Sequence, residues 1–169
     1  MDEVSDAFLH AARGELSKSL HKITHCLNQL NDEQIWHRPA AEMNSIANIL
    51  IHLCGNLRQW IICGVGGAND VRNRQAEFDD RSMRSKKDLL AEFSDVIRQC
   101  DAVLAKVDRK NLLEMRRIQG FDVQLLGAIF STCGHLQGHV QEIIHITRMQ
   151  KGTDYQFDFV PKGKEQGGT

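Results

Sequence analysis

Proline is scarce in this chain of 169 residues, which contains only Pro39 and Pro161. Because proline removes a backbone donor and clashes with the preceding turn, the stretch between them is free to form long helices. No apolar run approaches the roughly 20 residues needed to cross a bilayer. The acidic start also lacks the basic and apolar regions of a signal peptide. The sequence therefore predicts a helical protein without a membrane partner.

An excess of charge is absent too, since the formal net charge is −1. This gives no electrostatic reason to expect nucleic acid or an anionic membrane as a partner. The five cysteines are an odd number without C-x-x-C spacing, which predicts reduced thiols in a cytoplasmic protein. The length and the 41% apolar content predict one globular domain with a sizeable core.

Four segments carry apolar residues at steps of three and four, which is typical of amphipathic helices. We expect these helices at residues 3–30, from a cap at Asn44 or Ser45 to Cys63, from a cap at Ser85 to about Val107, and at about 122–151. The polar stretch 66–84 is expected to be a long loop, and no strand alternation of useful length is present. The prediction is an all-α four-helix bundle over residues 1–152, with a partly disordered C-terminal tail at 153–169.

Two histidine pairs have the four-residue spacing that places both rings on one helix face: His21 with His25, and His135 with His139. On a helical wheel, the second pair lies among the buried positions and opposite a polar stripe. The first pair lies roughly 100–160° from the apolar stripe of its own helix, so we interpret it as a surface pair with at most adventitious metal binding. His145 points away from His135 and His139 and is not expected to share an ion with them.

A third ligand has to come from another helix, because one helix face cannot surround an ion. Residues 43–68 contain a single charge, Arg58, so the second helix is expected to be buried nearly all round. An uncharged polar stripe nevertheless follows one side of this helix within about 80° of arc, made of Asn48, His52, Asn56 and Gln59. Such a stripe suits a polar cavity, in which the amides hold the imidazole tautomer or orient a water.

We therefore predict a metal site formed by His52, His135 and His139. Three neutral nitrogens with open coordination positions fit Zn²⁺, Ni²⁺ or Fe²⁺ and are typical of a catalytic site. The alternative is a set of hydrogen-bonded core histidines without an ion. Glu142 lies one turn beyond His139, and we expect it to accept a hydrogen bond from a ligand imidazole rather than to act as a general base.

Three stretches resemble the DinB/YfiT-like superfamily of metal-dependent bundle proteins: Trp36–Pro39, Asn44–Leu57 and His135–Ile143. The superfamily has one histidine on the second helix, then His-x3-His followed by x-x-Gln/Glu-Ile on the last long helix. His52, His135, His139 and Glu142 match these positions, and the resemblance covers residues 1–152.

The resemblance implies an up-down-down-up four-helix bundle that binds a divalent ion, commonly zinc or nickel, and is often a homodimer. Members with an assigned chemistry join low-molecular-weight thiols such as bacillithiol or mycothiol to electrophiles, and related members are thiol-dependent isomerases. This chemistry suits the predicted site, because a divalent ion lowers the pKa of a coordinated thiol. We therefore expect a transferase that acts on small molecules. The alternatives are a non-enzymatic bundle that binds a metal or small ligand, and a bundle that has lost metal binding.

Other residues near the predicted site have a structural and a functional interpretation. Cys54, Cys63 and Cys133 are candidate nucleophiles, although we expect them to pack between close helices. Gly134 and Gly138 are expected to let a neighbouring helix approach. A basic run is expected to be solvated, with a lid that contacts an anion as the alternative; it comprises Arg72, Arg74, Arg81, Arg84, Lys86 and Lys87.

Overall fold

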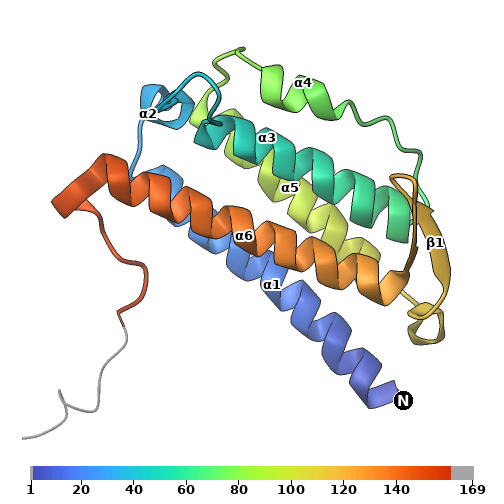
Figure 1. Cartoon of the computed structure of the whole chain (residues 1–169). Coiled ribbons are helices and arrows are strands. Elements are labelled where there is room, and N and C mark those ends of the chain that lie inside the picture. The colour runs from blue at the N-terminus through green and yellow to red at the C-terminus, as the bar shows by residue number, and fades with distance from the viewer. Residues whose placement is uncertain (1, 161–169) are drawn as a thin grey trace, which may run out of the picture.

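Four long helical stretches lie side by side in a computed structural model, which describes residues 2–160 (Figure 1). They are α1 (Asp2–Asn28), α3 (Ile46–Leu57) with its continuation η1 (Arg58–Val65), α5 (Lys86–Leu104) and α6 (Leu125–Lys151). Helices α1 and α6 run in one direction along the bundle, and α3 and α5 run in the other (Figure 1). The expected up-down-down-up, all-α four-helix bundle is confirmed.

The core lies where the apolar faces of these helices meet. Helix α1 packs on α5 and α6, and α3 packs on the same two helices. The large side chains at the centre are fully buried, among them Leu16, Ile23, Leu27, Ile49, Leu50, Leu53 and Phe93. Because apolar residues recur at three- and four-residue steps along each helix, these side chains share one face and leave water together.

The predicted caps on the second and third long helices are confirmed. The Ser45 hydroxyl accepts from the backbone N–H of Asn48, and the Ser85 hydroxyl accepts from that of Asp88. Each cap satisfies one of the backbone donors that a helix N-terminus leaves without a partner. A short helix that was not predicted, α2 (Asp32–Trp36), precedes the first cap.

Residues 66–85, called here the crossing segment, join the end of η1 to the start of α5. Because α3 and α5 run in the same direction, the chain has to return along the bundle between them (Figure 1). The expectation of a plain loop is wrong at one place, since helix α4 (Arg74–Asp79) forms there, capped by Asn73. Helix α4 packs on α3.

A β-hairpin precedes α6, in a stretch where the sequence shows no strand alternation of useful length. Strands β1 (Met115–Ile118) and β2 (Phe121–Gln124) pair antiparallel, with Ile118 opposite Phe121. The two turn residues between them have positive φ, 52° at Gln119 and 84° at Gly120. Such a turn matches the twist of two antiparallel strands. Helix α6 consequently begins at Leu125, about three residues later than expected.

The second long helix was expected to end at Cys63, but it continues as a π-helix to Val65. The backbone N–H of Gly66 donates to the carbonyl of Ile61, five residues earlier, at 2.9 Å. A methyl group on Gly64 would lie 2.4 Å from Ile118 Cδ1, so the bare glycine lets β1 pack closely on η1. Wider helical turns of this kind often occur at functional sites.

The described part of the predicted tail folds back along α1. Residues 152–154 form a short turn, η3 (Gly152–Asp154), and the carbonyl of Gln156 lies 2.7 Å from His25 Nε2. The rest of the predicted tail, residues 161–169, lies outside the described residues. None of the helices described for residues 2–160 is long and apolar enough to cross a membrane.

Candidate metal centre

Three imidazole rings from two antiparallel helices meet beside the crossing segment. His52 is on α3, and His135 and His139 are one turn apart on α6. Their ring centroids are 4.6–5.2 Å apart, and one nitrogen from each ring lies within 4.8 Å of the other two. Within residues 2–160, no other group of three His, Cys, Asp or Glu side chains comes this close. The structure thus brings together the three predicted ligands.

Two of the rings are oriented by carboxylates. His52 Nδ1 lies 2.9 Å from Glu77 Oε2, and His139 Nδ1 lies 2.7 Å from Glu142 Oε2. Because an ionised carboxylate only accepts, the contact with Glu142 places the His139 proton on Nδ1 and leaves its Nε2 lone pair for a ligand. His52 Nδ1 lies 3.2 Å from Arg72 Nη2 as well, but the Glu77 carboxylate at 2.9 Å is its closer partner and favours the same tautomer. Glu142 therefore makes the contact predicted for it, whereas Glu77 was not predicted.

The Glu77 carboxylate is itself held by Arg72. Arg72 Nε donates to Oε1 at 2.6 Å and Nη2 to Oε2 at 2.8 Å, and only 5% and 8% of the two side chains are exposed. Burial alone would raise the pKa of Glu77, but the hydrogen bonds from Arg72 and His52 and the Arg72 charge outweigh burial and lower it. Glu77 is therefore a carboxylate at neutral pH.

A glycine on α3 makes room for this ion pair. A Cβ atom at Gly55 would lie 1.9 Å from Glu77 Oε1 and 3.1 Å from Arg72 Nε. Since His52 is only three residues earlier on α3, the carboxylate can reach its ring only where the helix surface is bare. Gly55 thus lets the crossing segment, which carries Glu77, pack closely on the helix that carries His52.

The predicted amide stripe does not contact His52. Asn48 Nδ2 donates to the carbonyls of Glu77 and Asp80 at 3.0 and 3.1 Å, so it fixes α4 on α3. Gln59 accepts from Arg72 at 2.8 Å and donates to Asp70. In both cases the amide supports the crossing segment that carries Glu77, and it acts on the imidazole through that segment.

The two histidines on α6 lie at the rim of the core, which differs from the buried position that the helical wheel predicts. His52 is 6% exposed at its side chain, but His139 is 22% exposed, and His135 is partly exposed as well. The wheel places them correctly on the side facing α3. It does not show that α4 packs on α3, nor that a cleft opens beside His52 and His135.

His135 is neutral at physiological pH. Burial, reinforced by the neighbouring His139, His52 and arginines, lowers the pKa of His135 from 6.5 to about 4. Its Nε2 lies 3.0 Å from His52 Nε2. Two nitrogens bonded to one ion at about 2.0–2.1 Å lie about 2.8–3.4 Å apart for bond angles of about 90–110°. The spacing of His52 and His135 therefore fits a shared divalent ion, and one nitrogen of His139 lies within 4.8 Å of both.

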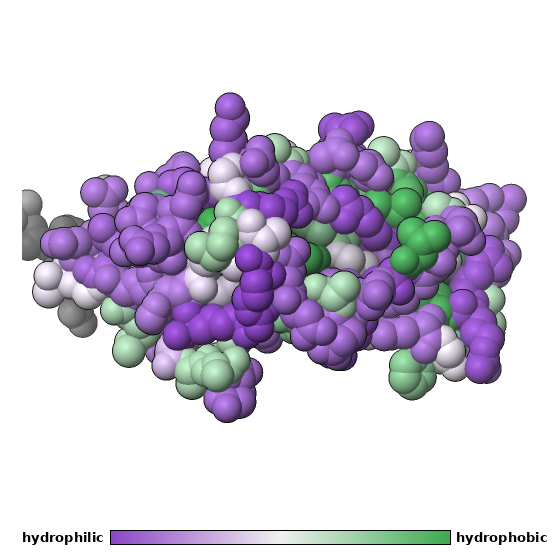
Figure 2. Space-filling model, turned by 90° about the horizontal axis from the view of Figure 1, so that it is seen from above, coloured by the Kyte–Doolittle hydropathy of each residue, from purple (hydrophilic) through white to green (hydrophobic). Residues whose placement is uncertain are grey.

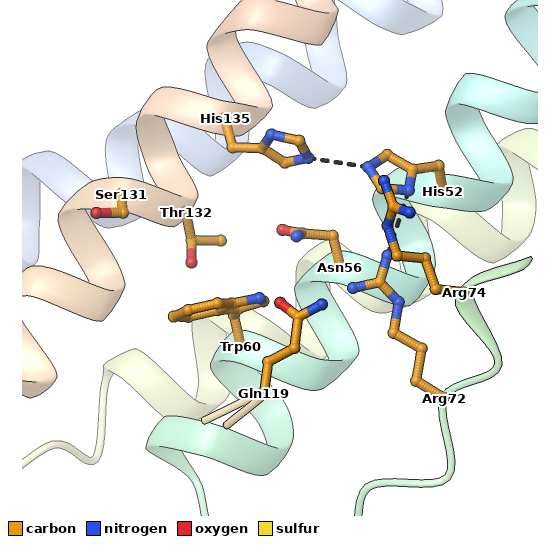
Figure 3. A pocket seen from close by; sticks show the side chains of 9 residues that line it. All are labelled: His52, Asn56, Trp60, Arg72, Arg74, Gln119, Ser131, Thr132 and His135. Carbon is orange, nitrogen blue, oxygen red and sulfur yellow. Dashed lines mark hydrogen bonds between the residues drawn. The ribbon is translucent and has the colours of Figure 1, made fainter. Parts of the chain in front are cut away.

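A cleft of about 400 Å³ opens beside the triad (Figure 3). His52 and His135 form one end of it, Trp60 lies on η1, Gln119 comes from the hairpin turn, and Arg74 reaches in from the crossing segment. Seen from above, this face of the molecule is mostly hydrophilic, with apolar atoms visible mainly in a hollow near its middle and toward the hairpin (Figure 2). The cleft gives a small molecule a route to His52 and His135.

The first histidine pair is not part of this site. His21 is 68% exposed at its side chain and its Nε2 lies 2.8 Å from Asp158 Oδ1, while His25 contacts the described end of the tail. His145 on α6 is exposed.

The cysteines do not have the character of activated nucleophiles. Burial raises the pKa of Cys54 and of Cys100 to about 12, and that of Cys133 to about 11. Burial also raises the pKa of Cys63, whose thiol donates to the carbonyl of Asn69. A thiol that stays protonated at neutral pH is a poor nucleophile, so packing is their role here.

Two further expectations are wrong. A Cβ added at Gly134 or Gly138 would meet nothing within 4 Å, so neither glycine lets a helix approach. The basic run is not uniformly solvated either, because Arg72 is buried against Glu77 and Arg84 pairs with Glu92 at 2.7 Å. Arg74 lines the cleft.

Comparison with known proteins places this geometry in a family. A family model described as "Protein of unknown function (DUF1572)" matches residues 3–164. The chain belongs to the DUF1572 family. A search of curated proteins finds no match to this DUF1572 protein.

Solved structures resemble the bundle over most of its length. A DinB-like protein from Bacillus cereus has 15% identity and a TM-score of 0.69, with 90% of this chain and 96% of that chain covered. A mycothiol-dependent maleylpyruvate isomerase has 12% identity and a TM-score of 0.64, with 80% of this chain and 60% of that chain covered. At these identities the likeness shows the fold, which is the four-helix bundle expected from the resemblance to DinB-like proteins.

Proposed function

We propose that this protein is a divalent-metal-dependent enzyme that transfers a low-molecular-weight thiol to an electrophilic small molecule. The observation that carries the proposal is the triad itself, in which the Nδ1 atoms of His52 and His139 are both committed to carboxylates. Their Nε2 atoms and that of His135 are then available to zinc, nickel or iron. The mycothiol-dependent structural neighbour supports the choice of a thiol.

Each residue has a defined part in this proposal. His52, His135 and His139 would hold the ion, and Glu77 and Glu142 would fix the ring orientations and tautomers. When bound, the ion would lower the pKa of a thiol in its coordination sphere and keep it as the nucleophilic thiolate. The chain's own cysteines do not supply this thiolate, since burial keeps them protonated.

Because the histidine triad is open on one side, it favours an enzyme over a protein that only stores a metal ion. A protein that only retains a metal surrounds it with four protein ligands, as structural zinc sites do. Here two of the three ligands, His52 and His135, line a cleft that admits a small molecule, and no fourth His, Cys, Asp or Glu of residues 2–160 joins the cluster. This arrangement supports an enzyme over the non-enzymatic alternative.

The setting of the enzyme is part of the proposal. Five free cysteines support a reducing, cytoplasmic location, and the net charge of −1 supports a small-molecule substrate rather than nucleic acid. The homodimer stays a prediction; exposed Met115, Phe121 and Phe130 offer apolar surface for one.

Metal content is the direct test. Wild-type protein and the His139→Ala variant would be purified without chelator, loaded with Zn²⁺ or Ni²⁺, dialysed and assayed by elemental analysis. We expect about one ion per wild-type chain and a large loss in the variant. His145→Ala is the matched control, because it removes an exposed histidine from the same helix and should keep the ion.

Thiol transfer is then measured with the loaded protein, using N-acetylcysteine and 1-chloro-2,4-dinitrobenzene as probes. Full metal content in His139→Ala would disprove the ligand assignment. A retained ion without turnover over a panel of thiols and electrophiles would make the protein a metal-binding bundle instead.

A further inference from the structure

The cleft beside the triad carries positive charge without any acidic residue in its lining. Arg72 and Arg74 are both among its nine lining residues, and the others are neutral or imidazole side chains. The charge of Arg72 is compensated by Glu77, which it binds with two nitrogens. Arg74 is therefore the side chain that determines the electrostatic character of the cleft.

Arg74 has no acidic partner within residues 2–160. Its guanidinium lies 4.9 Å from the centroid of the Phe78 ring, which in turn lies 4.9 Å from the His52 ring. It makes no ion pair or hydrogen bond to any other described residue. Figure 3 shows it pointing toward the end of the cleft formed by His52 and His135. An unpaired guanidinium in a concave site attracts a planar anion, which it can bind through two parallel hydrogen bonds.

The remaining lining also has free binding capacity. The side-chain amides of Asn56 and Gln119 and the hydroxyl of Ser131 make no hydrogen bond to another part of the described chain. Trp60 offers an apolar face between them and leaves its indole N–H free (Figure 3). A cleft of about 400 Å³ with an apolar floor, a few polar groups and one charge is typical of a site for a small organic ligand.

We propose that this cleft binds a small organic acid, with its carboxylate on Arg74, its apolar body against Trp60 and its far end toward His52 and His135. A carboxylate fits better than a phosphate, because one guanidinium balances one negative charge. The proposal names a substrate class for the thiol transfer, and it rests on that function only for the reactive end of the ligand. The carboxylate can belong to the thiol or to the electrophile.

The test compares an acid with its neutral amide. Dissociation constants of N-acetylcysteine and N-acetylcysteine amide would be measured on the zinc-loaded protein by quenching of tryptophan fluorescence. Of the two tryptophans, Trp36 is buried and Trp60 lines the cleft, so a bound ligand changes the Trp60 signal. We expect wild type to prefer the acid by about ten-fold and Arg74→Gln to lose that preference.

Two variants and one ligand complete the experiment. Arg74→Lys should keep part of the preference, because it keeps the charge but loses the fork of donors. Arg98→Gln makes the same charge change on the exposed surface of α5, where Arg98 pairs only with Asp95, and it should behave as wild type. N-acetylalanine has the carboxylate without the thiol, so its binding to chelator-treated protein tests the cleft independently of the metal and of thiol transfer.

An equal acid-to-amide preference in wild type and Arg74→Gln would overturn the proposal, as would an equal loss in Arg98→Gln. If the protein takes up no zinc in the metal-loading test but binds N-acetylalanine in an Arg74-dependent way, the cleft is supported and the proposed function is rejected. If the protein binds both thiols only when zinc is present, and binds the acid and the amide equally well, the proposed function is supported and the carboxylate site is rejected.

Discussion

Glu77 reaches the histidine triad from outside the four long helices, yet its contact with His52 is as short as an ordinary hydrogen bond. Its carboxylate is buried between that imidazole and the Arg72 guanidinium, so it determines both the tautomer and the direction of the ring. Glu142 has the same kind of contact with His139, but 44% of its side chain is exposed to water. The two carboxylates thus differ in environment rather than in geometry.

Replacing each glutamate by glutamine should separate these two roles. We expect Glu77→Gln to weaken zinc binding by about 10–100-fold, because the amide no longer fixes the tautomer of His52. It should also lower the free energy of unfolding by about 3 kcal/mol, because the buried Arg72 loses its counter-charge. Glu142→Gln should change zinc affinity by less than ten-fold and stability little. Competition with a chromophoric chelator and urea unfolding measure both effects; equal losses in the two variants would contradict the assignment.

The sequence predicts His52, His135 and His139 because helical periodicity determines which face of a helix each residue occupies. Glu77 and Arg72 could not be found in this way, since they lie in a stretch without periodicity. A helical wheel gives the direction of a side chain but not the segment that covers it. Asn73, which can cap a helix, followed by Glu77 was the one local signal of a short helix with an inward carboxylate.

At the scale of elements, α3 and α4 meet through a glycine. Gly55→Ala would normally strengthen a helix, because alanine has the higher helix propensity. Here the added methyl group would overlap Glu77 Oε1. We expect the variant to be less stable than wild type and to bind zinc more weakly, as the carboxylate moves away from His52.

Gly134→Ala is the matched control for this prediction. It makes the same change on α6, beside His135, but the added methyl group meets nothing within 4 Å. We expect it to raise the free energy of unfolding by about 0.5–1 kcal/mol and to leave zinc affinity unchanged. If thermal unfolding and zinc titration show the two alanine variants to be alike, close packing at Gly55 is not what positions Glu77.

The hairpin shows why some elements could not be predicted. Its strands have four residues each, which is too short for alternation to stand out from the surrounding sequence. They form because Gln119 and Gly120 adopt positive φ and Ile118 packs against the bare surface at Gly64. The first cause is a turn conformation and the second is a tertiary contact, and neither follows from local periodicity. Ser45 and Ser85, by contrast, cap helices through local contacts and were predicted correctly.

For the whole molecule, the lowered pKa of His135 makes the stability of the metal-free protein depend on pH. The group titrates at about 4 when folded and at about 6.5 when unfolded. Between these values the unfolded chain binds more protons, so stability falls as the pH is lowered from 6.5 to 4. Urea unfolding of chelator-treated protein should show this fall, and His135→Gln should reduce it.

Zinc should change this behaviour in a defined direction. An ion that binds only the folded state at 100 times its dissociation constant adds about 2.7 kcal/mol of stability. Because the ion competes with protons for the imidazoles, this gain should be larger at pH 7.5 than at acidic pH. A melting temperature that stays unchanged by millimolar zinc at pH 7.5 would argue against a native metal site.

The parallel course of α3 and α5 has a consequence for how such a protein could diversify. The ligand helices belong to the packed bundle, where most changes cost stability, but Arg74 belongs to the crossing segment that joins η1 to α5. Exchanging the cleft-facing residues of that segment, while Arg72 and Glu77 stay to orient His52, would redirect the chemistry to a different substrate without changing the ligand helices. The long connection that the topology demands is thus also the part of the molecule that is most open to retargeting, by natural selection or by a protein engineer.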